Sequence, residues 1–435
     1  GTSVRFDGNV TLTGGDTANS FLGDIVLDGL SFTTAQDIII GNAASDQVLL
    51  SGGAVTLSTG TSDAPITVVS LVDGGQPFTL NAGAGALTMS GLVGGTTPLS
   101  GLEMTAGAMV LTGIGSGGAP GVSGAVTAVS SASISLNGLQ YVSGGAQSWT
   151  AATGVRYLPS GDGSWSAGGT GISLPATDLY LDHDTHTLTL GSALSVQNLY
   201  FYRGTLDPAA QTITTGGDFA VFGPSYDPDD NDYGNLADDT RFAYWVTSAL
   251  AYVPGGGTAP IGPFSPAAHN AAIMNLDTCT LSVGGNFYVN GADLPATASW
   301  TLTLPDNTAS NPQYNTTAAV TANQWGDPYA VLLNSHVYYC QASYPVSAAE
   351  PVGAEHNNGA VDEGNNSNLF FTRPEIGIAS TIYDDVIMIT MNDNLGVAVD
   401  IENDNGEILS AIETVAASIA AGGVWYNSAS PIQFL

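Results

Sequence analysis

Lysine is absent from this chain of 435 residues. The basic side chains other than histidine are five arginines that lie far apart in the sequence: Arg5, Arg156, Arg203, Arg241 and Arg373. A surface that binds nucleic acid or anionic membrane lipids needs clustered basic side chains, so we expect neither partner. Schiff-base chemistry and a phosphate-binding P-loop each need a lysine, and both are therefore excluded.

The formal net charge is −33, although only 10% of the residues are charged. The 38 acidic residues amount to roughly 9% of the chain, below the ~12% expected if acids are half of the usual charged share. The imbalance therefore comes from missing bases rather than from surplus acids. Ten acids lie in residues 1–175 and 28 in residues 176–435, so we expect cations and partners to bind the later loops.

Long apolar runs and helical periodicity are also missing. No run reaches the ~18 apolar residues of a membrane span, so we expect no direct membrane insertion. Short β-branched runs alternate instead with Gly, Asn, Asp and Ser turns every ~8–12 residues, which indicates an all-β chain. Because the sequence begins at Gly1 without a signal peptide, we expect a mature form or an excised fragment.

Internal repeats are the strongest pattern. A short unit recurs as Gly-Ala-Val-Thr-Leu-Ser at 53–58, Gly-Ala-Leu-Thr-Met-Ser at 85–90 and Gly-Ala-Met-Val-Leu-Thr at 107–112. A longer unit at 212–223 recurs at 280–291, 68 residues later, and both copies predict a strand, a Gly-Gly corner and a second strand. Units too small to bury a core alone become stable by stacking. The repeats therefore predict a parallel β-helix; the competing sandwich would need antiparallel hairpins.

We predict an all-β protein built on a right-handed parallel β-helix, or solenoid, with long loop insertions. The β-helix is expected over residues 1–223, with further coils over 271–344. An acidic, Pro-rich loop excursion is expected at 224–270, and a polar loop or linker at 345–372. Residues 373–435 are predicted to form a small C-terminal β-sandwich-like module of immunoglobulin-like kind. At 63 residues it is too short for a complete sandwich, so it is either truncated or a cap on the last coil.

Six aspartates in one Pro-bounded segment form the first candidate site: Asp227, Asp229, Asp230, Asp232, Asp238 and Asp239. Calcium prefers several hard oxygen ligands, so this loop could bind Ca²⁺ as a cofactor. The order of an EF-hand is not met, since Tyr233 would fall on a ligand position. The alternative is a solvated acidic loop.

A second candidate lies at Asp182, Asp184 and His186, which share one face of an extended chain because strand side chains alternate. Two carboxylates and an imidazole could hold a divalent metal. The alternative is an exposed strand and turn. The two cysteines, Cys279 and Cys340, match no zinc-binding spacing. They form either a disulfide, as an oxidising extracellular compartment would allow, or two buried thiols.

Threonine pairs of the form Thr-x-Thr recur along the chain, for example at Thr187/Thr189, Thr212/Thr214 and Thr301/Thr303. Stacked coils would align such pairs into a flat array. Their spacing in the sequence is too irregular to predict one continuous array, and the strand propensity of threonine explains them.

The pattern Thr-Ile-Thr-Thr-Gly-Gly-Asp-Phe at 212–219, with the Gly-Ala-Val-Thr-Leu units, resembles large repetitive bacterial surface proteins of the filamentous-haemagglutinin-like and autotransporter-passenger-like β-helix type. The resemblance covers residues 1 to about 344 and rests on repeats and composition. It implies secretion, display on the bacterial cell surface, and an adhesive or structural role. It supplies no catalytic residues.

We therefore expect a non-enzymatic extracellular protein, either an adhesin or a structural subunit of a surface layer or filament. Loops 224–270 and 345–372 would meet a host or neighbouring cell surface, a glycan or another copy of the chain. The alternative is a glycan-binding or glycan-degrading β-helix that uses Asp residues, since paired acids suffice for glycoside hydrolysis. An enzyme would gather its acids in a groove, whereas an adhesin would disperse them.

Overall fold

The computed structural model describes most of residues 4–222 and a smaller part of the rest of the chain. The described ranges are 4–12, 18–117, 119–222, 272–285, 287–290, 292, 294–304, 330–333, 336–343, 352–355, 361–367, 369–370 and six short strands after residue 375. Regular structure in these ranges is entirely β-strand. Among the described residues there is no helix of the length and apolarity that crossing a membrane requires.

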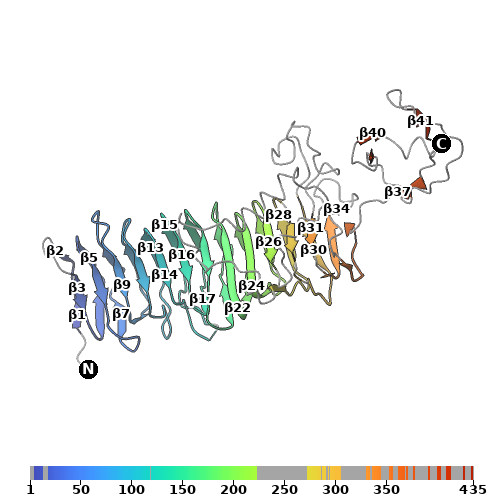
Figure 1. The fold of residues 1–435 in the computed structure, drawn as a ribbon. Helices are drawn as coiled ribbons and strands as arrows, with labels where there is room; N and C mark the ends of the chain where they lie inside the picture. Colours follow the sequence, from blue (N-terminus) through green and yellow to red (C-terminus); the bar gives the residue numbers. More distant parts are fainter. Residues whose placement is uncertain are drawn as a thin grey trace.

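Three parallel sheets run along one elongated body (Figure 1). The long sheet has thirteen strands in sequence order. Its strands are β2 (Val10–Leu12), β5 (Ser31–Thr34), β8 (Val55–Ser58), β11 (Pro77–Asn81), β13 (Gly101–Ala106), β15 (Val126–Ser130), β18 (Gln147–Ala151), β21 (Ile172–Leu174), β23 (Leu194–Val196), β25 (Thr212–Thr215), β28 (Thr280–Val283), β30 (Trp300–Thr303) and β33 (Cys340–Ser343).

The second sheet lies beside the long sheet and is also parallel throughout. Its strands are β3 (Asn19–Phe21), β6 (Ile38–Ile40), β9 (Ile66–Val68), β12 (Leu87–Met89), β14 (Met109–Leu111), β16 (Ile134–Leu136), β19 (Val155–Tyr157), β22 (Leu179–Leu190), β24 (Leu199–Asp207), β26 (Phe219–Phe222), β29 (Phe287–Asn290), β31 (Ala330–Leu333), β34 (Val352–Glu355) and β36 (Leu369–Phe370). Because β22 and β24 are long, their second halves continue into the third sheet.

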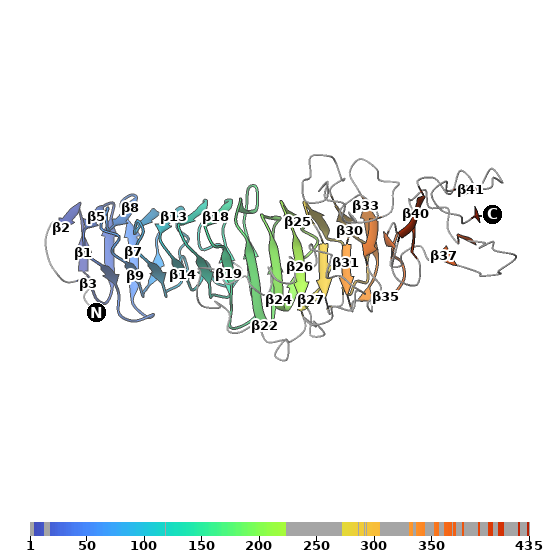
Figure 2. The ribbon, with the colours of Figure 1, turned by 45° about the horizontal axis from the view of Figure 1, so that its top comes forward.

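The third sheet is built from shorter strands that single bridges join in its middle. Its strands are β1 (Val4–Phe6), β4 (Ile25–Asp28), β7 (Gln47–Ser51), β10 (Leu71–Asp73), β17 (Gln140–Val142), β20 (Gly163–Ser166), the ends of β22 and β24, and β27 (Ala272–Met274). Further along the chain, β32 (His336–Val337) and β35 (Val361–Asp362) pair as a two-stranded parallel sheet. Each turn of the chain adds one rung to each sheet, and Figure 2 shows the coils in a single row from the blue N-terminal strands to the orange ones.

Alternation of apolar and small polar residues builds each rung. In β8, Val55 and Leu57 are buried, whereas Thr56 and Ser58 point outward and are partly exposed. Glycine permits the tight corners: Gly74 has φ +121°, and a Cβ there would lie 2.2 Å from the carbonyl oxygen of Leu50 on the neighbouring coil. The parallel register excludes the sandwich and confirms the predicted parallel β-solenoid.

The longer repeat is confirmed as two stacked coils, because Thr212 pairs with Thr280 and Phe219 with Phe287. The shorter units are not equivalent. The unit at 53–58 lies in the long sheet, whereas those at 85–90 and 107–112 are neighbours in the second sheet. A strand of five or six residues carries the same alternation in any sheet, so likeness of sequence alone does not fix its sheet.

Coils also continue beyond residue 344, where a loop or linker was expected. Strands β34 and β36 pair in parallel with each other, β34 pairs with β31, and β35 pairs with β32. The expected excursion at 224–270 lies outside the described residues. In 373–435 the described strands form antiparallel pairs: β37 (Ile376–Gly377) with β38 (Thr390–Met391), β39 (Val399–Glu402) with β40 (Ile408–Ile412), and β41 (Trp425–Tyr426) with β42 (Gln433–Phe434).

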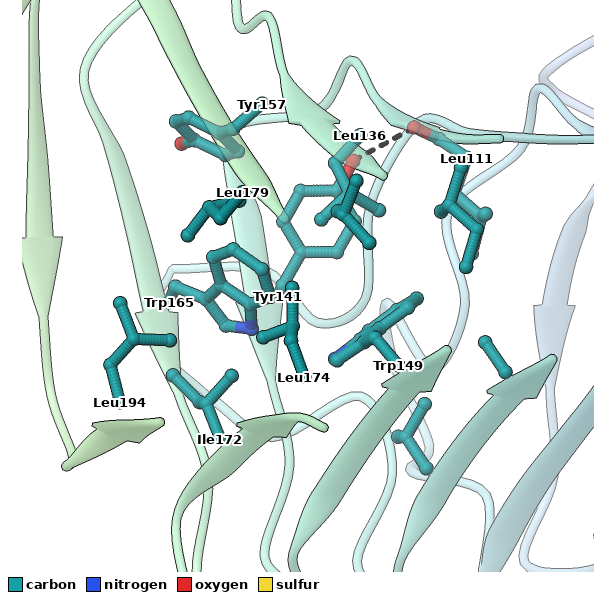
Figure 3. Close-up of a cluster of buried hydrophobic side chains, with 14 of the residues drawn as sticks. Leu111, Leu136, Tyr141, Trp149, Tyr157, Trp165, Ile172, Leu174, Leu179 and Leu194 are labelled. Atoms are coloured by element: carbon teal, nitrogen blue, oxygen red, sulfur yellow. Dashed lines mark hydrogen bonds between the residues drawn. The ribbon is translucent and has the colours of Figure 1, made fainter. Parts of the chain in front are cut away.

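An aromatic cluster fills the core of the middle coils (Figure 3). Tyr141, Trp149, Tyr157 and Trp165 are fully buried, with neighbouring ring centroids 6.1–6.3 Å apart. The amide of Gln147 lies among them, fully buried, and its oxygen accepts the indole N–H of Trp149 at 3.2 Å and of Trp165 at 2.7 Å. Its NH₂ group donates to the two carbonyls and the hydroxyl nearest to it: Tyr141 O, Ser166 O and Ser143 Oγ.

Candidate functional site

The predicted calcium loop, Asp227 to Asp239, lies outside the described residues. Ca²⁺ binding there stays a prediction. Thermal melting with and without a calcium chelator tests it, since a site that binds only the folded chain raises the melting temperature with ligand. An unchanged melting temperature would contradict the site.

The second metal candidate lies in β22, where the chain passes from the second sheet to the third. Asp182 faces inward, with its side chain 1% exposed, and accepts a hydrogen bond from Nε of Arg203 at 2.5 Å. His186 instead lies at the surface, with Nδ1 4.0 Å from a carboxylate oxygen of Asp162. The side chain of Asp184 lies outside the described part. Among the described residues, no group of three or more His, Cys, Asp or Glu side chains is placed to hold a metal.

Irregular pairing explains why simple alternation does not describe this segment. The register between β22 and β24 shifts between Leu181 and Asp182 and again between Asp182 and Thr187. The prediction that Asp182 and His186 share one face assumes that strand side chains alternate with a period of two. The corner breaks this alternation, so the two side chains do not lie on a common face.

The corner contains a buried histidine, His183, that the sequence did not single out. Its ring is 0% exposed, stacks on Phe201 at 5.3 Å and meets Tyr157 edge-on at 6.0 Å. Nδ1 lies 2.7 Å from the carbonyl oxygen of His186, which can only accept, so Nδ1 carries the hydrogen. Burial lowers the pKa of His183 below its usual value, against the weaker opposing effects of that hydrogen bond and of Asp182. The ring is therefore neutral at pH 7.

The two cysteines are free thiols in the structure, and both are buried. Trp300 pairs with Cys340, and Cys279 immediately precedes the strand on the other side of β30. Two strand spacings are ~9.6 Å, whereas a disulfide needs Cα atoms within about 7 Å. The structure thus has two buried thiols, one of the two expected outcomes. Burial raises the pKa of Cys279 to about 12 and that of Cys340 further, so neither is a reactive thiolate at pH 7.

Acidic side chains at the described corners link neighbouring coils. Each of five aspartates accepts a backbone N–H from a residue 20 to 25 positions later. These are Asp24, Asp63, Asp73, Asp162 and Asp277. Backbone N–H groups stabilise the carboxylates here in place of basic side chains, which shows how coils almost without bases accommodate their acids.

Asp277 illustrates the strength of these links. Its carboxylate accepts the hydroxyl of Thr297 at 2.7 Å and the backbone N–H groups of Thr297 and Ala298. Hydrogen bonds to the charged form favour it, and those from Thr297 hold the pKa of Asp277 below its usual value. This group therefore contributes stability that is present above its unfolded pKa and is lost as the pH falls through its folded pKa.

The outward face of the long sheet carries a ladder of hydroxyl groups that one glutamate, Glu103, interrupts. Paired positions from β5 to β30 run through eleven outward, partly or fully exposed residues: Ser31, Thr56, Thr79, Glu103, Thr127, Ser148, Ser173, Ser195, Thr214, Ser282 and Thr303. Only Glu103 is charged. Five of the eleven residues are threonines, so the row is not a continuous array of Thr-x-Thr pairs, although corners of variable length bring its hydroxyl groups into line.

A surface pocket lies on the third sheet between the exposed side chains of Leu92 and Leu139. Its other lining residues are Thr112, Gly115, Ser116, Gly117, Asn137, Gly138, Gln140 and Ser160. No acid, base or thiol lines this pocket, so its serine and threonine hydroxyls have no general base beside them to activate them. The stacked rings of Tyr180, Tyr200 and Tyr202 are at most 9% exposed and provide no open platform for a sugar.

Comparison with known proteins finds no counterpart: no family model, no curated protein and no solved structure matches the chain. The fold and the placement of its side chains are therefore the basis for assigning a role.

Proposed function

We propose that this chain is a non-enzymatic, extracellular bacterial surface protein, an adhesin or a structural subunit of a surface layer or filament. Its solenoid is a rigid rod, right-handed as parallel crossover connections nearly always are, and belongs to the filamentous-haemagglutinin-like and autotransporter-passenger-like kind. The C-terminal residues form a β-sandwich-like module or cap. Loops at 224–270 meet a cell surface, a glycan or a second copy of the chain.

One observation carries this proposal: the acids at the described corners are dispersed. A glycoside hydrolase needs two carboxyl groups facing each other across a cleft, ~5–9.5 Å apart. The five linking aspartates lie instead at separate corners, and each is bound to backbone N–H of a neighbouring coil. Such carboxylates serve the rod itself, and they lie at separate corners rather than facing each other across a cleft.

The shape and surface of the coils support the same role. Thirteen strands spaced ~4.8 Å apart give a rod close to 60 Å long, which holds anything attached to it well away from its base. The long face is hydroxyl-rich and carries one charge in eleven rungs, so it lets a strongly acidic chain approach another surface with little repulsion.

Two measurements on the purified chain test the proposal. Beads coated with the chain should adhere to bacterial or host cells more than beads coated with a matched acidic protein, or negative-stain images should show regular filaments or layers. Incubation with a panel of neutral polysaccharides should release no new reducing ends. Reducing-end release, or the absence of both adhesion and assembly, contradicts the proposal. Release of new reducing ends would point to the glycan-degrading alternative.

A further inference from the structure

The corner shared by β22 and β24 holds two buried polar atoms without a partner. Within the described part of the chain, Oδ2 of Asp182 and Nε2 of His183 accept no hydrogen bond. Buried polar groups are nearly always hydrogen-bonded, so two such atoms on adjacent residues need an explanation. The corner also joins two sheets, because β22 and β24 each pass through it without interruption.

The ring of His183 is held in place on every side. Phe201 stacks on one face, Tyr157 meets its edge, and Nδ1–H is donated to the carbonyl of His186. Gly204 lies against it with φ +100°, and a Cβ there would be 2.2 Å from Nδ1. The ring therefore has no room to turn Nε2 toward solvent while the two strands stay paired.

The groups around His183 are poorly suited to a second positive charge. Arg203 on β24 is already a cation and is paired with Asp182. Among the side chains that the structure describes, His186 on the same strand and Tyr157 on β19 are the other titratable groups near the ring, and burial keeps the Tyr157 hydroxyl neutral by raising its pKa. A proton on Nε2 would sit in a mostly aromatic pocket, where charge is costly unless it is paired.

We propose that this corner is an acid-sensitive latch: protonation of His183 separates β22 from β24 locally and weakens the middle of the rod. The closed corner holds a neutral ring, whereas an opened corner exposes the ring to water and takes up a proton. The closed state thus binds fewer protons. Its stability is complete above the ordinary histidine pKa of about 6.5 and falls as the pH drops below it. The latch concerns the solenoid alone and does not depend on the proposed adhesive function.

Hydrogen exchange of the whole chain, corrected for intrinsic rates, tests the latch. Between pH 7.5 and pH 5.0, peptides over 179–190 and 199–207 should lose protection by about tenfold for each pKa unit between the closed and open corner. Peptides over 77–81 and 101–106, in coils without a buried histidine, should change far less. His183→Phe keeps the stacked ring and removes the titrating group, so the excess loss should vanish. His336→Asn, a surface histidine elsewhere in the solenoid, should leave it unchanged.

A titration of the wild-type chain keeps the test independent of how the variant folds. The imidazole signal of His183, identified by its loss in His183→Phe or by elimination with variants of the other four histidines, should titrate below pH 6.5 by NMR. A pKa of His183 at or above 6.5 would mean that protonated Nε2 donates a hydrogen bond to Asp182 and that protonation stabilises the corner. That value, or an excess loss of protection that persists in His183→Phe, overturns the proposal.

Discussion

The early coils and the middle coils share one backbone frame but fill it differently. From β7 to β14 the inward side chains are almost all aliphatic, such as Leu57, Leu80 and Leu87, and each rung stacks in parallel register on the one before it. From β17 to β22 they include two tryptophans and two tyrosines around a buried glutamine. Aliphatic rungs need only volume, whereas buried indole and phenol groups also need hydrogen-bond partners. The stability of the middle coils therefore depends on particular residues, whereas that of the early coils depends on the alternation of apolar and polar positions.

Removing an aromatic ring should show this contrast most strongly. Trp165→Ala deletes a fully buried indole and is expected to lower the free energy of unfolding by about 4 kcal/mol, against about 3 kcal/mol for Leu80→Ala in the early coils. Trp165→Phe retains a ring but removes the N–H donated to Gln147, so its effect should be smaller. Denaturation with guanidinium, followed by tryptophan fluorescence and circular dichroism, measures all three. Equal losses for Trp165→Ala and Leu80→Ala would show that the two regions do not differ.

The buried amide should be the next most sensitive position. Gln147→Leu has a similar volume but leaves two indole N–H groups without their acceptor and two carbonyls without a donor. Each buried orphan group costs ~1–3 kcal/mol, and partial relaxation brings our expectation to a total loss of about 3 kcal/mol. Gln211→Leu, at a corner where the amide makes one long 3.5 Å bond, should change stability by less than about 0.5 kcal/mol. A stable Gln147→Leu variant would mean that water can replace the amide.

The same contrast explains how far the sequence could predict the molecule. Period-two alternation and the copy of 212–223 at 280–291 are local patterns, and they predicted the parallel solenoid and two of its stacked coils. Gln147 and His183 are single polar residues in short strands, and nothing in the sequence marks them as buried until the corners fix which way each strand faces. Asp182 and His186 are an even number of residues apart, so regular alternation would place them on one face of the strand. The register shifts at the corner separate them instead.

Corner lengths account for the other differences. The hydroxyl ladder was hidden because a solenoid tolerates extra residues at its corners, so equal positions in space are 19 to 68 residues apart in the sequence. The linking aspartates were equally hidden, since an acid in a turn looks the same whether it faces water or the backbone of the next coil. Their placement needs the register, which depends on contacts distant in the sequence.

The smallest predicted effect concerns these aspartates, and it separates a buried link from an exposed one. Asp73 is 1% exposed, and its carboxylate accepts the N–H groups of Thr96 and Thr97 and the amide of Gln47. Asp73→Ala removes the buried carboxylate that these three donors share in a partly buried site, so we expect a loss of about 2 kcal/mol. Asp63 binds one N–H, that of Ala84, at an exposed corner where water can replace it.

Asp63→Ala should therefore lose less than about 1 kcal/mol, and Asp73→Asn, which keeps one acceptor oxygen, should lie between the two alanine variants. Guanidinium denaturation at pH 7 measures the series. If Asp63→Ala and Asp73→Ala lose equally, burial does not set the strength of these links, and the acids are interchangeable corner residues. If only Asp73→Ala unfolds at a lower guanidinium concentration than the wild-type chain, the stability of the coils depends on a few buried carboxylates. The exposed aspartates can then be substituted without destabilising the solenoid.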